Sequence, residues 1–243
     1  MHRPRFLERA GDVLFRWRSF TPVPLIALAI PLVWMARGPA SPLWLFGGIA
    51  LCLLGQVIRI WVLGQVPDGT SGQNELLIAD SLNTTGPYAH TRNPLYLGNF
   101  LVTLGLCLVA HSAVLLVAVI VLFAIQYRAI IAAEERFLRG QFGASYDAWT
   151  ARVPRFWPRM RAATSGPARP FDARRALRKE HNPAAAWLLL AIVLHGLGGF
   201  TRAHALLFAV VVAAWLSVKA WKHRWLSGNF GADLRRRIRE TAR

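Results

Sequence analysis

The sequence predicts an all-α membrane protein with about six transmembrane helices. Three observations lead to this fold class: 54% of the 243 residues are hydrophobic, the apolar residues stand in long blocks, and the basic residues stand between those blocks. A formal net charge of +17 would also suit a nucleic-acid-binding protein. Because Lys and Arg are confined to segments between apolar blocks, the charge instead follows the pattern of membrane topology, and no nucleic-acid partner is expected.

Six apolar blocks can be distinguished along the chain. Several are shorter than the ~20 residues of a perpendicular span, so flanking aromatic and polar residues must supply the missing length. Few polar residues separate the third block from the fourth or the fifth from the sixth, which predicts two tight helical hairpins. The blocks cover residues 22–36, 42–64, 95–110, 112–127, 184–200 and 203–218.

The first block also resembles the apolar part of a signal peptide. The segment before it carries Glu8 and Asp12 beside five arginines, and no clean small-residue cleavage site follows the block. We therefore expect a retained first span, with a partly inserted helix as the alternative.

The distribution of Lys and Arg predicts the orientation of the helices. With six spans and both termini in the cytoplasm, 27 of the 29 basic residues lie on the inner side, and only Arg37 and Arg202 lie outside. All twelve acidic residues also fall on the inner side. The polar loops are therefore expected to face the cytoplasm, where soluble cofactors are available.

Composition divides the chain into four parts. Residues 1–158 form the membrane core, and residues 159–183, rich in Arg, Ala, Pro and Gly, are predicted to be a basic linker or a helix lying on the membrane surface. Residues 184–218 form a C-terminal transmembrane hairpin. Residues 219–243 form a basic cytoplasmic tail, which serves topology control or binds anionic lipid headgroups.

The two cysteines, Cys52 and Cys107, both lie inside apolar blocks. Such cysteines behave as small buried hydrophobes, and they predict neither a disulfide nor a metal site. The chain shows no cluster of Cys and His with metal-ligand spacing, so no metal is expected.

The first polar cluster is a loop punctuated by prolines that runs straight into the third apolar block. Its sequence is Gly86-Pro87-Tyr88-Ala89-His90-Thr91-Arg92-Asn93-Pro94-Leu95-Tyr96-Leu97-Gly98. Helix initiation explains part of it, because Asn93 is a good N-cap and Pro94 suits the first helical position. Asn182-Pro183 is expected to begin the fifth block in the same way.

Other residues of this loop are harder to explain by helix initiation. Gly86-Pro87 forces a turn, and Gly98 allows a backbone or a ligand to approach the first helical turn. Tyr88 and Tyr96 bring two phenols to the membrane interface, and Arg92 is the only Lys or Arg in the loop. A helix N-terminus beside an arginine favours an anionic group, so structural and functional interpretations remain equally open at this point.

The second polar cluster is Glu134-Glu135, on a predicted extension of the fourth span into the cytoplasm. Adjacent helical residues point about 100° apart, so one glutamate can face inward while the other faces solvent. Glu135 has Arg139 at i+4 and is expected to form a solvated ion pair with it. Position 138 is leucine, so Glu134 has no such partner and is the favoured functional residue.

Two further features accompany these clusters. Phe142, Tyr146, Trp149 and Val153 have helical spacing, which predicts an amphipathic helix that lies on the bilayer or caps a cavity beneath it. Arg59 lies inside the second apolar block, where an ionisable residue is either functional or snorkels to the nearby inner interface.

Taken together, these motifs resemble the isoprenylcysteine carboxyl methyltransferase family, a superfamily that also includes phospholipid N-methyltransferases. The resemblance covers about residues 40–158, and its two blocks occur in the family's order, separated by a helical hairpin. One residue departs from the isoprenylcysteine branch, which usually has Arg-His-Pro where this chain has Arg92-Asn93-Pro94, closer to the phospholipid branch. The motifs are Gly86-Pro87-Tyr88, Arg92 to Gly98, Glu134-Glu135, Phe142-Gly143, Tyr146 and Val153-Pro154-Arg155-Phe156.

The resemblance implies an α-helical membrane enzyme that binds S-adenosylmethionine on the cytoplasmic side and methylates a lipid or prenylated acceptor in the bilayer. It implies catalytic roles for Arg92 and Glu134. The cofactor contacts that it implies are Gly86, Pro87, Tyr88, Arg92, Asn93, Pro94, Tyr96, Gly98, Glu134, Glu135, Tyr146 and Arg155.

Two other functions compete with this one. A member of the same fold that has lost methyl transfer would serve as a membrane assembly or transport factor and would not bind S-adenosylmethionine. A small transporter would require inverted repeats or charges at the middle of the bilayer; His195 is the strongest residue for it and is expected to be a helix-packing histidine.

Overall fold

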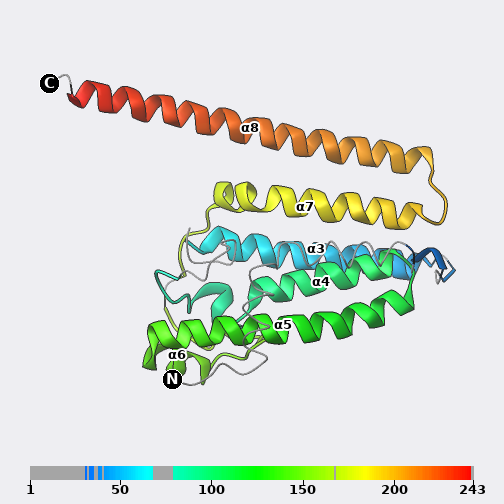
Figure 1. Cartoon of the computed structure of the whole chain (residues 1–243), viewed down its shortest axis with the longest axis horizontal. Coiled ribbons are helices and arrows are strands. Elements are labelled where there is room, and N and C mark those ends of the chain that lie inside the picture. The colour runs from blue at the N-terminus through cyan, green and yellow to red at the C-terminus, as the bar shows by residue number, and fades with distance from the viewer. Residues whose placement is uncertain are drawn as a thin grey trace.

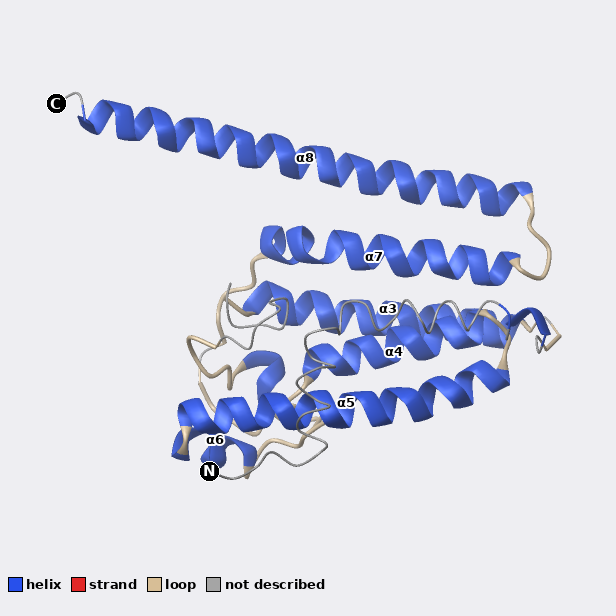
Figure 2. Ribbon diagram, viewed as in Figure 1, coloured by secondary structure: helices blue, strands red, loops and turns tan. Residues whose placement is uncertain are grey.

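The computed structural model describes residues 31, 33–35, 38, 39, 41–67, 79–166 and 168–241. Within these ranges the chain is helical and contains no strand, which confirms the predicted all-α class there. Helices α3, α4, α5 and α7 lie side by side, and α8 runs along the outside of α7 (Figures 1 and 2). The elements are α3 (Pro42–Gln65), the 3-10 helix η1 (Gly86–Ala89), α4 (Pro94–Val109), α5 (Ala113–Phe142), α6 (Ala144–Thr150), α7 (Ala173–Gly196) and α8 (Arg202–Thr241).

Three of these helices are long and apolar enough to cross a membrane: Pro42–Gln65, Ala113–Phe142 and the segment Arg202–Lys222 of α8. Helix α4 is apolar but shorter. Large apolar side chains lie exposed on the outer faces of these helices, as a bilayer requires and water would not favour; they include Phe46, Val57, Val117, Ile125, Leu206 and Val210. These features indicate a membrane protein. The first apolar block lies almost wholly outside the described residues, so the count of six spans and the side of each terminus stay predictions.

The hairpin between the third and fourth blocks is confirmed. Helices α4 and α5 are joined by only three residues, and His111 takes a positive φ of 54° to reverse the chain. Ser112 then caps α5, its hydroxyl accepting the N–H of Leu115 at 3.3 Å. As predicted, α5 continues well past residue 127; the structure ends it at Phe142.

Helix α7 begins earlier than the sequence predicts. Its N-cap is Asp172, whose carboxylate accepts the N–H of Arg175 at 2.9 Å, and the helix runs through Pro183 to Gly196 without a break. The prediction that Asn182-Pro183 begins a helix is therefore wrong. The turn before the proline is held by buried side chains, among them Glu180, and Pro183 removes only one main-chain hydrogen bond.

Helices α3 and α4 cross at unusually close range because glycines face each other at two levels. A Cβ atom on Gly48 would lie 2.6 Å from the carbonyl oxygen of Gly105, and one on Gly55 would lie 2.5 Å from that of Gly98. The two glycines on each helix are seven residues apart, so they share one face. Close backbone approach of this kind is how transmembrane helices gain packing energy without a hydrophobic driving force.

Adjacent glycines on α3 offer a direct test of this packing. We expect Gly48→Ala to cost about 1–3 kcal/mol, because the new methyl group meets backbone that cannot move aside. A Cβ atom on Gly47 would have no neighbouring atom within 4 Å, so Gly47→Ala should be neutral or stabilising by up to about 1 kcal/mol. Thermal unfolding in detergent measures both; equal melting temperatures for the two variants would contradict the close crossing.

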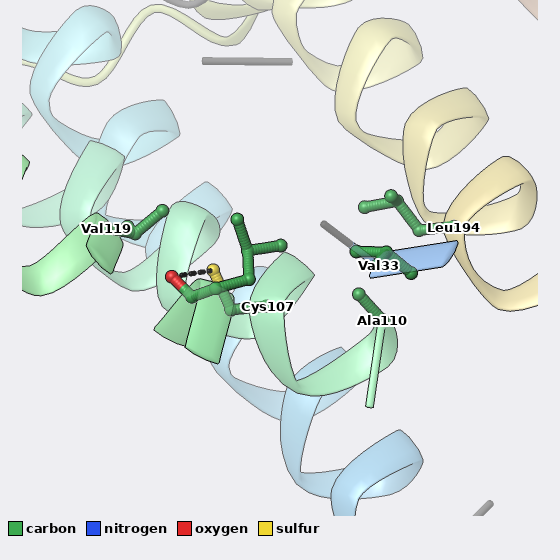
Figure 3. Packing of buried hydrophobic residues seen from close by; sticks show 6 residues of the cluster. Val33, Cys107, Ala110, Val119 and Leu194 are labelled. Carbon is green, nitrogen blue, oxygen red and sulfur yellow. Dashed lines mark hydrogen bonds between the residues drawn. The ribbon is translucent and has the colours of Figure 1, made fainter. Parts of the chain in front are cut away.

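A hydrophobic cluster lies where α4 turns into α5 (Figure 3), at the other end of α5 from α6 (Figure 1). It joins α4, α5 and α7 to the short segment that contains Val33. Both cysteines are free and buried, as predicted, and the Cys107 thiol lies 4.0 Å from the carbonyl oxygen of Leu115. The cluster consists of Val33, Cys107, Ala110, Leu115, Val119 and Leu194.

Candidate functional site

The segment that follows α6 docks against the loop before α4 by main-chain hydrogen bonds. The N–H of Arg92 donates to the carbonyl of Pro154 at 2.9 Å, and the N–H of Ala163 donates to that of Ala89 at 2.8 Å. The Thr91 hydroxyl adds a bond of 2.8 Å to the carbonyl of Phe156. The two motif regions, about 60 residues apart in sequence, are thereby fixed beside each other.

Asn93 takes part in this docking and does not cap α4 with its side chain. It occupies the N-cap position, but its side-chain amide donates to the carbonyl of Arg155 at 2.7 Å and makes no capping bond. Pro94 is the first residue of α4, as predicted. The Asn-Pro pair therefore serves both helix initiation and attachment of the 154–163 segment.

Glu135 is held between two arginines. Its Oε1 atom accepts from Arg92 at 2.9 Å and from Arg155 at 3.0 Å, and its Oε2 atom accepts from Arg155 as well. The Glu135 and Arg92 side chains are only 13% and 19% exposed. The expected ion pair of Glu135 with Arg139 is wrong, because Arg139 of α5 bonds the exposed Asp147 of α6 at 2.8 Å.

Glu134 lies beside two tyrosines. The Tyr96 hydroxyl donates to its Oε1 atom at 2.5 Å. Burial first, and then the negative charge of Glu134, raises the pKa of Tyr88 far above its usual range. The two phenols predicted at the interface thus lie next to one of the paired glutamates.

Tyr146 belongs to the same group of side chains. It is 1% exposed, and burial, followed by the charge of Glu135, raises its pKa to about 12 against the opposing influence of Arg92. It remains a protonated phenol at physiological pH. The structure therefore brings together, at one end of the bundle, the seven titratable residues that the sequence singles out: Tyr88, Arg92, Tyr96, Glu134, Glu135, Tyr146 and Arg155.

The predicted amphipathic helix over residues 142–153 is shorter than expected. Helix α5 ends at Phe142, Gly143 takes a φ of +50° that favours glycine, and α6 covers only Ala144–Thr150. Its apolar face packs inside the protein, where Trp149 donates its ring N–H to the carbonyl of Tyr88 at 3.3 Å. The segment thus covers the 86–98 loop.

The two glycines of the loop have different surroundings. Gly86 has a φ of +60°, which confirms the predicted turn with Pro87, and a side chain there would collide with Gln65 of α3. Gly98 faces α3, and a Cβ atom on it would lie 2.7 Å from Cγ of Arg59. The close approach that Gly98 permits is therefore that of α3 and Arg59.

Arg59 does not snorkel, because its guanidinium is paired inside the bundle. It donates to Glu180 of α7 through Nε at 2.9 Å and through an Nη atom at 2.6 Å, and it also bonds Asn99 of α4. Glu180 is 2% exposed and accepts a third bond from Gln56 at 2.8 Å. Glu180 was not among the residues predicted from the sequence. It could have been found as an acidic residue one turn before an apolar block, since an ionisable residue so close to a span usually has a partner inside the bundle.

Comparison with known proteins finds a family match for part of the chain. Residues 43–145 match the phospholipid methyltransferase family. The matched phospholipid methyltransferase segment contains α3, η1, α4, α5 and the start of α6, including the 86–98 loop and both glutamates. This confirms the family resemblance, while Tyr146, Arg155 and α7 lie beyond the segment matched.

Two curated proteins are similar to parts of the chain. The cobalt-zinc-cadmium resistance protein CzcN of Cupriavidus metallidurans is 34% identical over 120 residues, 49% of this chain and 51% of that protein. The nickel-cobalt-cadmium resistance protein NccN of Alcaligenes xylosoxydans xylosoxydans is 31% identical over 147 residues, 59% of this chain and 63% of that protein. The matches thus span less than two thirds of these relatives. No solved structure matches the chain.

Proposed function

We propose that this chain is an S-adenosylmethionine-dependent methyltransferase that acts on a lipid or prenylated acceptor at the cytoplasmic face of a membrane. The observation that carries the proposal is the convergence of two arginines, two glutamates and three tyrosines within and beside the segment matched by the phospholipid methyltransferase family. The family suggests methyl transfer, and the apolar helices suggest an acceptor held in the bilayer.

The residues present suit the cofactor chemically. Nε of Arg92 is a buried donor with no hydrogen-bond partner among the described residues, so it can receive an anionic group such as the amino-acid carboxylate of S-adenosylmethionine. Glu134 and Glu135 are suited to hold ribose hydroxyls or an amino group. Glu135 paired with both arginines carries a net charge of +1, and the carboxylate of Glu134 brings the four charged side chains to formal neutrality before the cofactor arrives.

When bound, S-adenosylmethionine supplies an electrophilic methyl group. The protein's part is to hold that group and the acceptor in line and to keep water away. Aromatic rings suit this task, since Tyr96 and Tyr127 meet edge to face with centroids 4.8 Å apart and can surround a positive charge. Phe100, Phe123 and Phe156 continue this aromatic surface, which suits an apolar acceptor.

The proposal is tested with purified protein, methyl-labelled S-adenosylmethionine and a total lipid extract. We expect saturable cofactor binding and transfer of label to a lipid fraction, both weakened about tenfold or more by Glu134→Gln, which removes the charge beside Tyr96. The exposed Asp147→Asn variant serves as the control and should behave like the wild type. Failure of the wild-type chain to bind the cofactor at millimolar concentration would refute the proposal.

The alternative is a member of the same fold that does not transfer methyl groups and serves as a membrane assembly or transport factor. The names of the two relatives, both metal-resistance proteins, favour this alternative. It predicts no labelled lipid and no cofactor binding, and it predicts that deleting the gene for this chain changes metal tolerance. The labelling experiment above therefore separates the two functions.

A further inference from the structure

A row of polar contacts leads from α7 to the candidate site. Arg59 links Glu180 of α7 to the side-chain oxygen of Asn99 on α4. The amide nitrogen of Asn99 in turn donates to the Tyr127 hydroxyl at 3.2 Å. The Tyr127 ring lies against Tyr96, whose hydroxyl bonds Glu134, so the row ends at a proposed site residue.

Glu180 sets the direction of the first link. Its two carboxylate oxygens accept two bonds from Arg59, and the side chain is only 3% exposed, so it fixes the guanidinium in one orientation. The third guanidinium nitrogen, Nη1, then donates to the side-chain oxygen of Asn99. This in turn requires the Asn99 amide nitrogen to face Tyr127, because an amide has only one carbonyl oxygen.

Gly98 makes this route across α4 possible. A Cβ atom at this position would lie 2.7 Å from Cγ of Arg59, so the arginine stem passes over the space that the glycine leaves empty. The contact explains why a glycine stands immediately before Asn99. It also shows that the row depends on close packing of α3 against α4.

We propose that Glu180 is a positioning residue that acts through Arg59, Asn99 and Tyr127 on the Tyr96–Glu134 pair and thereby sets the affinity for S-adenosylmethionine. This inference rests on the proposed function. It extends the site to α7, which lies outside the segment that matches the family.

A double-mutant cycle tests the row with direct binding of labelled S-adenosylmethionine to purified protein. We expect Glu180→Gln and Tyr127→Phe each to weaken cofactor affinity by about tenfold, and the double variant to be no weaker than either alone, because both break the same row. Losses that multiply in the double variant would overturn the proposal.

A matched control separates positioning from simple attachment of α7. Arg175 of α7 donates to the carbonyl of Val66, at the end of α3, at 3.2 Å, and it contacts no member of the row. Arg175→Met removes this bond and keeps the apolar stem, so it should leave cofactor affinity within about twofold of the wild type. A loss as large as that of Glu180→Gln would show that α7 attachment alone matters and would overturn the proposal.

A second variant covers the case in which Glu180→Gln does not fold because it leaves Arg59 as an unpaired buried charge. The neutral pair Arg59→Gln with Glu180→Gln removes that charge and is expected to fold. Cofactor affinity should stay about tenfold reduced in it, and wild-type affinity would overturn the positioning role. Absence of cofactor binding in the wild-type chain would refute the proposed function itself, whereas equal affinities in the wild type and Glu180→Gln would refute this inference alone.

Discussion

Replacing Glu135 with alanine should have the largest effect on stability of any change at the candidate site. The substitution leaves Arg92 and Arg155 without the carboxylate between them and releases the 154–163 segment from α5. Breaking a buried ion pair costs about 3–5 kcal/mol. Because Arg155 is half exposed, we expect the lower end of this range, about 3 kcal/mol. We expect the melting temperature in detergent to fall by roughly 6–12 °C.

The control for this prediction is the exposed ion pair nearby. Arg139 and Asp147 are each more than half exposed, so Asp147→Ala should change stability by less than about 1 kcal/mol. A melting temperature for Glu135→Ala within a degree of that of Asp147→Ala would mean that Glu135 does not hold the two segments together.

Replacing Arg92 with lysine should strongly weaken cofactor binding without a matching loss of stability. Lysine keeps the positive charge opposite Glu135 but lacks the buried Nε donor, which has no partner among the described residues. We therefore expect near-wild-type stability and a loss of S-adenosylmethionine affinity of about tenfold to a hundredfold, measured by equilibrium binding.

The comparison of stability with affinity decides what Arg92 does. Arg92 would have a structural role only if two results are found together. Arg92→Lys would lower the melting temperature as much as Glu135→Ala does, and the protein that remains folded would bind S-adenosylmethionine with wild-type affinity. Arg92→Ala, which removes charge and donor together, should lose both stability and affinity.

The sequence predicted much of the fold and the membership of the site, for identifiable reasons. Apolar blocks marked the helices α3, α4, α5 and α8, because membrane helices must be apolar along their length. The residues of the 86–98 loop and the Glu134-Glu135 pair formed a recognisable motif, and the structure brings them together. Local chemistry also predicted the turn at Gly86 and the start of α4 at Pro94.

Errors arose where a local pattern had a long-range competitor. Spacing predicted that Glu135 pairs with Arg139, four residues further along the helix. Instead Glu135 binds Arg92 and Arg155 from other segments, and its side chain is only 13% exposed there, whereas Arg139 pairs with Asp147 in solvent. Asn182-Pro183 has the residues of a helix start, yet the buried Glu180 before it holds the preceding turns helical. Helical propensity and spacing describe neighbours in sequence and contain no information on such partners.

The sequence by itself determined that this chain forms apolar helices and that residues 43–145 match the phospholipid methyltransferase family, and it predicted the polar residues of the candidate site. Only the tertiary structure decided how those residues are paired and that α7 reaches the site through Glu180 and Arg59. The physical reason is burial. A charge inside a helix bundle must find a partner, and the identity of that partner depends on which helices lie side by side.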